Sequence, residues 1–145
     1  MPPFRFRLQQ ILNYRERLED EARLALVQAE NALAAERLRL SRLEDELHAA
    51  RLCMRQDARC AADFWLWQPY VQRLTEQRAA SLRRLDELAA AVASCQKQLQ
   101  QRSMERRLVD KLRHRHLQRH TYEENRRNQC TLDETATLAY CRRDD

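Results

Sequence analysis

The chain contains no glycine in 145 residues, and its three prolines stand at positions 2, 3 and 69. Glycine supplies the positive φ angles of tight turns and lets a backbone approach a phosphate group closely. Its absence argues against sheets joined by two-residue hairpin turns and against glycine-rich phosphate-binding loops. Alanine, leucine, glutamate, glutamine and arginine, which favour helix, dominate instead. The composition therefore predicts an all-α protein.

Apolar residues in the first part of the chain recur at alternating steps of three and four, which is the spacing of a coiled coil. Leu26, Leu33, Leu40, Leu47 and Met54 also recur every seven residues. This pattern predicts a first helix over about residues 6–62. The stripe expected to face a partner helix, interrupted by Arg15 and Glu36, is Leu8, Ile11, Leu18, Ala22, Ala25, Ala29, Leu33, Leu40, Leu43, Leu47, Ala50 and Met54.

The periodicity stops at an aromatic segment, residues 64–70, which holds four of the nine aromatic residues. Within it, Pro69 lacks an amide hydrogen and disfavours a helical conformation in the residue before it. We therefore expect a turn over about 63–69, a second helix over about 70–125 and a weaker helical tail over 131–141. Together these elements predict a single domain, residues 1–145, in which two long helices form an antiparallel coiled-coil hairpin.

The stripe of the second helix is apolar from Val71 to Leu99, but Arg102 and Arg106 then continue it. A charge in a coiled-coil seam weakens the pairing unless another group compensates it. A turn centred near residue 66 would place Glu30 opposite Arg102. We therefore expect the end that carries both termini to be less well packed than the middle, and to need a partner.

Positive charge is concentrated in a basic stretch, residues 102–119. Seven basic residues stand there against Glu105 and Asp110, and seven minus two gives the same excess, +5, as the whole chain. An acidic protein surface, a nucleic acid or a membrane surface could each bind this positively charged stretch. The alternative is that the stretch is a solvated helix face without a partner. No aromatic residue lies within the stretch, so single-stranded nucleic acid has no stacking platform there. We expect no nucleic-acid partner.

Neither a catalytic nor a metal site is expected. His116, His120 and Glu124 share one helix face, but only the histidine pair could hold one ion, and a solvated face accounts for the pattern better. The serines lack a neighbouring histidine at a useful spacing. We therefore expect no enzyme activity, no cofactor and no bound metal.

The cysteines, at positions 53, 60, 95, 130 and 141, form no Cys-x-x-Cys pair. In a reducing compartment such residues are small apolar side chains or exposed thiols. The first residues lack a hydrophobic signal region, and no apolar run approaches the ~20 residues of a transmembrane helix. We expect a cytoplasmic chain that does not insert into the membrane.

Motifs at the two ends suggest a family. The N-terminal motif is Phe4-x-Phe6-x-Leu8-Gln9-x-Ile11-Leu12-x-Tyr14-Arg15. The C-terminal motifs are Glu105-Arg106-Arg107-Leu108-Val109-Asp110-Lys111-Leu112-Arg113 and, further on, Leu132-Asp133-Glu134-x-Ala136. In this order and spacing they resemble the FliJ family, the stalk-like component of the flagellar type III export ATPase. The middle of the chain matches that family only in its periodicity.

The resemblance implies a stalk that inserts into the export ATPase hexamer and promotes its assembly. It also implies contacts with the export gate membrane protein and export chaperones at the cytoplasmic face of the inner membrane. By this analogy the end with both termini would enter the ring. The residues expected to face acidic loops of the ring are Arg102, Arg106, Arg107, Lys111, Arg113 and Arg115.

The aromatic residues Phe64, Trp65, Trp67 and Tyr70 form a candidate contact for the gate or for chaperones. The resemblance does not reach these residues, and a cap that closes the hairpin is the alternative. Three other functions remain open: the equivalent stalk of a virulence type III secretion system, a basic coiled coil that binds nucleic acid, and a homodimeric scaffold. For the stalk we expect a chain that is monomeric when alone.

Overall fold

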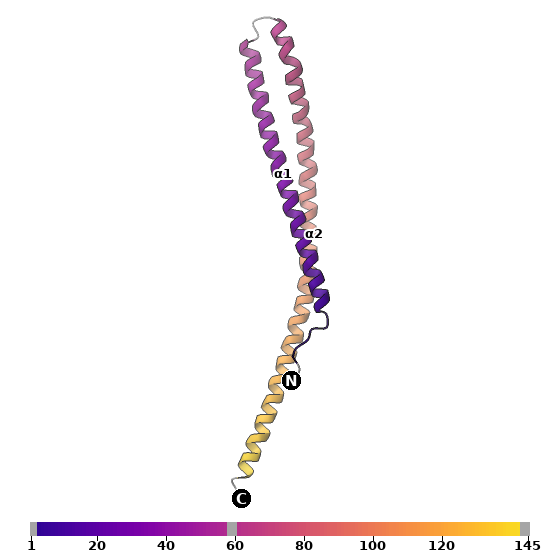
Figure 1. Cartoon of the computed structure of the whole chain (residues 1–145), viewed down its shortest axis with the longest axis vertical. Coiled ribbons are helices and arrows are strands. Elements are labelled where there is room, and N and C mark those ends of the chain that lie inside the picture. The colour runs from indigo at the N-terminus through magenta and orange to yellow at the C-terminus, as the bar shows by residue number, and fades with distance from the viewer. Residues whose placement is uncertain (1–2, 58–60, 143–145) are drawn as a thin grey trace. The chain divides into compact units, whose positions relative to one another are not determined.

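The structure, a computed structural model, describes residues 3–57 and 61–142. Helix α1 spans Gln9–Asp57 and helix α2 spans Ala61–Cys141, with lengths of 49 and 81 residues (Figure 1). No strand occurs in the two described ranges. The all-α prediction is confirmed.

The chain divides into two compact units. The turn unit is Asp20–Gln100, and the terminal unit is Met1–Glu19 together with Gln101–Asp145. In each unit a part of α1 packs against a part of α2. In the turn unit Arg78 pairs with Glu44 and Ser81 pairs with Glu36, so positions along α2 rise as positions along α1 fall. The prediction of an antiparallel pair of long helices is confirmed.

A small apolar core holds the turn unit together. Leu43, Leu47 and Ala50 of α1 are buried with Leu74 of α2, and Trp67 and Val71 pack against them. Steps of three and four residues separate the core positions on each helix, which is the spacing that keeps side chains on one helix face. Each buried leucine contributes about 1.5–3 kcal/mol of hydrophobic free energy relative to an exposed one.

The stripe predicted for α1 is buried or half-buried at every position except Ile11. Ile11 is 45% exposed, whereas the next residue, Leu12, is fully buried. Leu12, Arg15 and Glu19 continue the three–four spacing toward Ala22, and all of them lie on the side of α1 that is less exposed. The seam therefore passes through Leu12, and Ile11 lies beside it.

The predicted helix bounds and turn near the aromatic segment are wrong. Residues 63–69 are helical, α1 ends at Asp57 and α2 begins at Ala61. Pro69 lies inside α2. Pro69 leaves the carbonyl of Trp65, four residues before it, without an amide partner, and both residues are exposed. Packing of Trp67 and Val71 on the core also continues the helical spacing through this position.

The predicted break between the second helix and a separate helical tail is also wrong, because α2 runs without interruption to Cys141. The sequence after Pro69 has neither glycine nor proline to end it. Residues 125–142 are all exposed. Within the terminal unit, this yellow end of α2 extends beyond the described segment that precedes α1 (Figure 1). Whether the whole chain behaves as one domain stays a prediction.

No helix within the described residues is long and apolar enough to cross a membrane. Four of the five cysteines are described and none of these four is in a disulfide. Cys53 and Cys95 are half-buried, whereas Cys130 and Cys141 are exposed. Cys60 lies outside the described residues.

Candidate functional site

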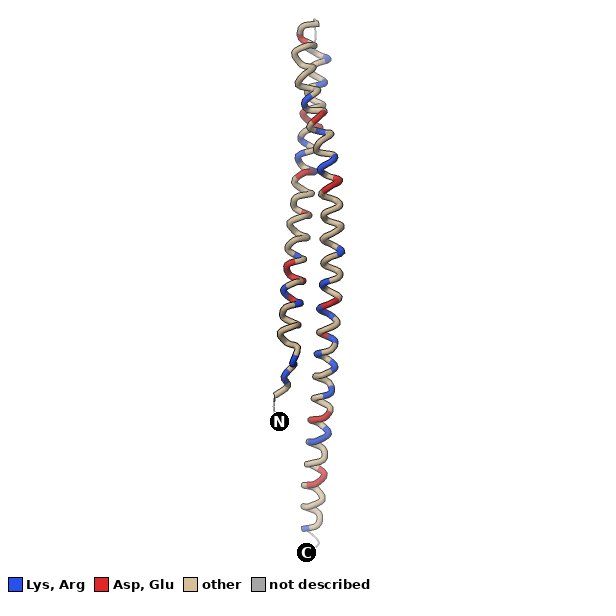
Figure 2. Tube along the Cα trace, turned by 90° about the vertical axis from the view of Figure 1, so that its right-hand side faces the viewer, with Lys and Arg blue, Asp and Glu red and all other residues tan. Residues whose placement is uncertain are grey.

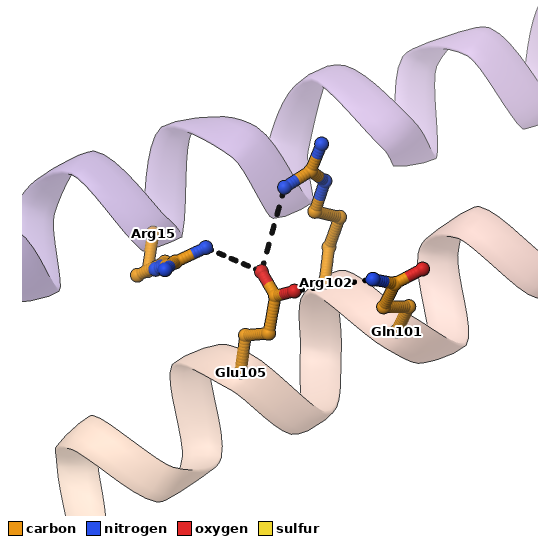
Figure 3. A network of polar contacts seen from close by, with 4 residues as sticks. All are labelled: Arg15, Gln101, Arg102 and Glu105. Atoms are coloured by element: carbon orange, nitrogen blue, oxygen red, sulfur yellow. Dashed lines mark hydrogen bonds and ion pairs between the residues drawn. The ribbon is translucent and has the colours of Figure 1, made fainter.

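A polar network centred on Glu105 joins the two helices in the terminal unit (Figure 3). The Oε2 atom of Glu105 accepts hydrogen bonds from Nη1 of Arg15 on α1 and, at 3.4 Å, from Nη1 of Arg102. Its Oε1 atom accepts one from Nε2 of Gln101 at 3.3 Å. Arg15, Arg102 and Glu105 are half-buried, whereas Gln101 is exposed. Arg15, which interrupts the apolar stripe, therefore has a charged partner on the facing helix.

A second charged pair lies beside this network. Arg106 of α2 donates a hydrogen bond from Nε to Oε2 of Glu19 on α1. Glu19 is only 3% exposed, and a buried carboxylate is costly unless a charge or a hydrogen bond compensates it. Arg106 is thus held against α1, where it compensates a buried charge.

The predicted register, centred near residue 66, is wrong. Glu44 pairs with Arg78, and the midpoint of their numbers is 61. The midpoints of the other paired residues, within either unit, also lie between 58 and 63. The register follows from where the helices end, because the interval between α1 and α2 is residues 58–60 rather than 63–69. With this register, the predicted pairing of Glu30 with Arg102 is also wrong, and Arg102 instead pairs with Glu105 three residues further along α2.

The remaining basic residues predicted to contact a ring are exposed. These are Arg107, Lys111, Arg113 and Arg115. Within the part of the chain that the structure describes, no ion pair involves any of them. Arg113 lines a surface hollow together with residues 4–6 and Gln9. Lys and Arg recur along this part of α2 (Figure 2). The structure thus separates the six predicted residues into Arg106, which pairs across the seam, Arg102, which pairs within α2, and four that face solvent.

The N-terminal segment before α1 lies against two histidines of α2. The rings of Phe4 and His120 meet edge to face with centroids 5.7 Å apart, and those of Phe6 and His116 do so at 5.9 Å. Two residues of extended chain span about 6.7 Å and four residues of helix span about 6 Å, so both contacts can form at once. We call this pair of contacts the aromatic clasp.

The aromatic clasp involves two of the three residues, His116, His120 and Glu124, that were considered as a metal site from the sequence. Each of the two histidines packs on a phenylalanine ring. In the described parts of the chain, no group of three or more His, Cys, Asp or Glu residues is arranged to hold a metal ion.

The structure divides the predicted aromatic contact. Trp67 packs against the core of the turn unit and meets Tyr70 edge to face, with ring centroids 6.1 Å apart. Trp65 is 70% exposed, and Phe64 and Tyr70 are also exposed. Trp67 therefore fits the interpretation of a packed cap, whereas Phe64 and Trp65 remain available on the surface.

Sequence reasoning missed several residues of these sites. Ser81 is buried and donates to Glu36, and its position could have been found by continuing the three–four spacing between Arg78 and Leu85. Glu105 was treated as an opposing charge and as part of the C-terminal motif but not as a residue of the seam, although it follows Arg102 at a seam spacing of three. The aromatic clasp left only a weak signal in the sequence. Phe4 and Phe6 are two residues apart in the segment before α1, and His116 and His120 are four residues apart on a helix.

Comparison with known proteins adds a family. A family model described as "FliJ: Flagellar FliJ protein" matches residues 4–145. Neither the curated proteins nor the solved structures contain a match to this chain.

Proposed function

The chain belongs to the FliJ family of flagellar proteins, and on that premise we propose that it is a coiled-coil stalk that binds the ring of the flagellar export ATPase. Membership makes the chain a flagellar export-related protein, of a family that is a non-catalytic component of export. In the proposed role it promotes assembly and activity of the ATPase hexamer. It also links the ring to the export gate membrane protein and to export chaperones, at the cytoplasmic face of the inner membrane and without a cofactor.

One observation supports ring binding most directly, namely the exposed and unpaired basic residues of α2 in the terminal unit. Arg107, Lys111 and Arg115 are exposed and form no ion pair within the described residues. The acidic residues of the same stretch are engaged, because Glu105 binds Arg15 and Asp110 lies 3.8 Å from His114. The surface therefore presents positive charge that acidic loops of a ring can complement, which raises association rate and specificity.

Arg102 and Arg106 have a different part in this proposal from the one expected at first. The ion pair of Arg106 with Glu19 joins α1 and α2, whereas Arg102 pairs with Glu105 of its own helix, which in turn binds Arg15 of α1. Arg102 and Arg106 act on ring binding through the rigidity of the terminal unit, while Arg107, Lys111, Arg113 and Arg115 make the contacts.

The gate or chaperone contact in the proposal is the exposed part of the aromatic segment. Aromatic side chains are enriched among the residues that dominate binding energy in interfaces. Phe64 and Trp65 are exposed on the first turns of α2, whereas Trp67 is engaged with the core. We therefore assign the contact to Phe64 and Trp65. Tyr70, which is exposed and meets Trp67, lies next to the packed part of the segment.

The test compares ATPase turnover and hexamer formation of the cognate export ATPase with and without this chain. The charge variant is R107E/K111E/R115E, and the control is R37E/R73E/R83E, which makes the same change of charge at exposed arginines of the turn unit. We expect the wild type and the control to promote assembly and the charge variant to lose that effect. A wild-type chain that neither binds the ATPase nor changes its turnover contradicts the proposal.

A further inference from the structure

Three exposed apolar residues form a row on α2 in the terminal unit. Met104, Leu108 and Leu112 are 62%, 67% and 36% exposed. They stand at i, i+4 and i+8, so they line up along one side of the helix. We call this row the apolar ridge. Neither the seam nor the aromatic clasp uses it.

The apolar ridge is turned away from α1. Arg106 reaches α1 through its hydrogen bond to Glu19. Met104 and Leu108 each stand two residues from Arg106, and two residues correspond to a rotation of about 200° around a helix. The ridge therefore lies on the side of α2 opposite the seam, where it has no partner within the described residues.

A basic ridge runs beside the apolar one. Arg107, Lys111 and Arg115 also stand at i, i+4 and i+8, and each follows a residue of the apolar ridge by three positions. Residues three and four apart are neighbours on a helix surface, so the two ridges interlock. Together they extend from residue 104 to residue 115, a length of about 17 Å or three helical turns.

We propose that these two ridges form one docking surface for an acidic amphipathic α-helix of the export ATPase. This inference rests on the proposed function and names the element that the ring would contribute. The apolar face of that helix covers Met104, Leu108 and Leu112, and a row of aspartates or glutamates beside it faces the basic ridge. The partner helix lies alongside α2 on the side that α1 does not cover.

The chemistry of the surface favours this occupant over others. A helix places apolar and acidic rows side by side at steps of three and four, which matches two interlocked ridges. Successive side chains of an extended segment point to opposite sides, so such a segment would reach one ridge only. A second copy of this chain would bring two basic ridges together, and like charges repel. A row of three apolar side chains is narrow for binding to a bilayer, because helices that bind membrane surfaces bury a broad apolar face.

The experiment measures the affinity of the cognate ATPase for four full-length chains. M104Q/L108Q replaces two of the three residues of the apolar ridge and keeps every charge, and R107E/K111E/R115E reverses the charge of the basic ridge. L24Q/L38Q is the matched control, because both leucines are exposed on α1 in the turn unit. We expect M104Q/L108Q to weaken binding by about tenfold or more, since two apolar side chains lose their burial, and the control to stay within about twofold.

The outcomes separate the two proposals. If the charge variant loses binding while M104Q/L108Q binds like the wild type, ring binding stands and the docking helix is wrong. If the wild-type chain does not bind the ATPase, the proposed function is wrong. In that case direct binding of a synthetic 14-residue helix with Leu and Glu rows decides the surface, against a scrambled peptide of the same composition. Equal binding of both peptides, or of neither, overturns it.

Two further measurements test the other occupants. Sedimentation of the wild-type chain that shows a dimer, lost in M104Q/L108Q, would assign the ridges to a second copy. Binding to vesicles containing anionic lipid that is lost in the same variant would assign them to a bilayer. Either result overturns the inference. We expect one chain per particle and no difference between the wild type and M104Q/L108Q on vesicles.

Discussion

The carboxylate of Glu19 on α1 is buried and accepts a hydrogen bond from Nε of Arg106 on α2, so a charged pair occupies a seam position that apolar residues fill elsewhere. A second pair, Arg15 and Glu105, lies beside it. Each charge in these pairs is compensated across the seam. The terminal unit therefore depends on these pairs, and removing one partner takes a compensating contact away from the other charge.

Substituting Arg106 tests this dependence. Arg106→Ala is expected to destabilise the terminal unit by about 1.5–3 kcal/mol, because the buried Glu19 carboxylate loses its hydrogen bond and ion pair with Arg106. Urea unfolding, combined with amide exchange near Leu12, measures the loss. The matched control is Arg107→Ala, one residue further and exposed, for which we expect a change of less than about 0.5 kcal/mol. Equal effects of the two substitutions would show that the pair contributes nothing.

Ile11 and Leu12 give a test of the seam position on α1. Leu12→Ala is expected to cost about 2–4 kcal/mol, because it removes a fully buried side chain and leaves a cavity. Ile11→Ala is expected to cost less than about 1 kcal/mol, since a partly exposed side chain loses little burial. Thermal unfolding of the two variants decides the matter. A larger loss of stability in Ile11→Ala than in Leu12→Ala would show that the seam passes through Ile11.

Ser81 and Glu36 form a polar pair in the seam of the turn unit. Ser81→Ala is expected to destabilise by about 1–3 kcal/mol, because the partly buried carboxylate of Glu36 loses its donor. The double variant E36L/S81L is expected to be as stable as the wild type or more stable, because apolar residues then fill the seam. Chemical denaturation measures both, and Ser41→Ala, at an exposed serine, is the control. A double variant less stable than Ser81→Ala contradicts this account.

The aromatic clasp holds the segment before α1 against α2. In F4A/F6A the ring contacts with His120 and His116 are lost, and each such contact is worth about 0.5–1.5 kcal/mol. We therefore expect trypsin to cleave after Arg5 and Arg7 about tenfold faster than in the wild type, as followed by mass spectrometry. Phe64→Ala, which removes an exposed aromatic ring in the turn unit, should leave these rates unchanged. Unchanged cleavage in F4A/F6A would mean that the clasp does not hold the segment.

The three–four spacing was sufficient to predict the helix pair and most of its seam. Leu43, Leu47 and Ala50 form the core because their spacing keeps them on one face, and that face is readable from the sequence. The register was not readable in the same way. Pro69 carries a strong local signal for a turn, but packing of Trp67 and Val71 outweighs it, and only the tertiary contacts reveal that balance.

The candidate site was predictable in its residues and not in their roles. Charge counting found the basic stretch because arginines are concentrated there. It could not tell that Arg106 turns inward to Glu19 while Arg107 stays on the surface, since adjacent helix residues differ by about 100° in direction and the register was displaced. With the correct helix ends, the same spacing argument separates the two.

The distance along the chain between paired residues sets an order of assembly. Arg78 and Glu44 are 34 residues apart, whereas Arg15 and Glu105 are 90 apart. Closing a longer loop costs more entropy, by about 0.6 kcal/mol for each doubling of the loop length. We therefore expect pairing to start near Asp57 and Ala61, where the loop is shortest, and to proceed toward the two chain ends. During synthesis, Glu19 leaves the ribosome early, but Arg106 emerges only after more than eighty further residues. The first part of the chain to be made is therefore the last to find its place.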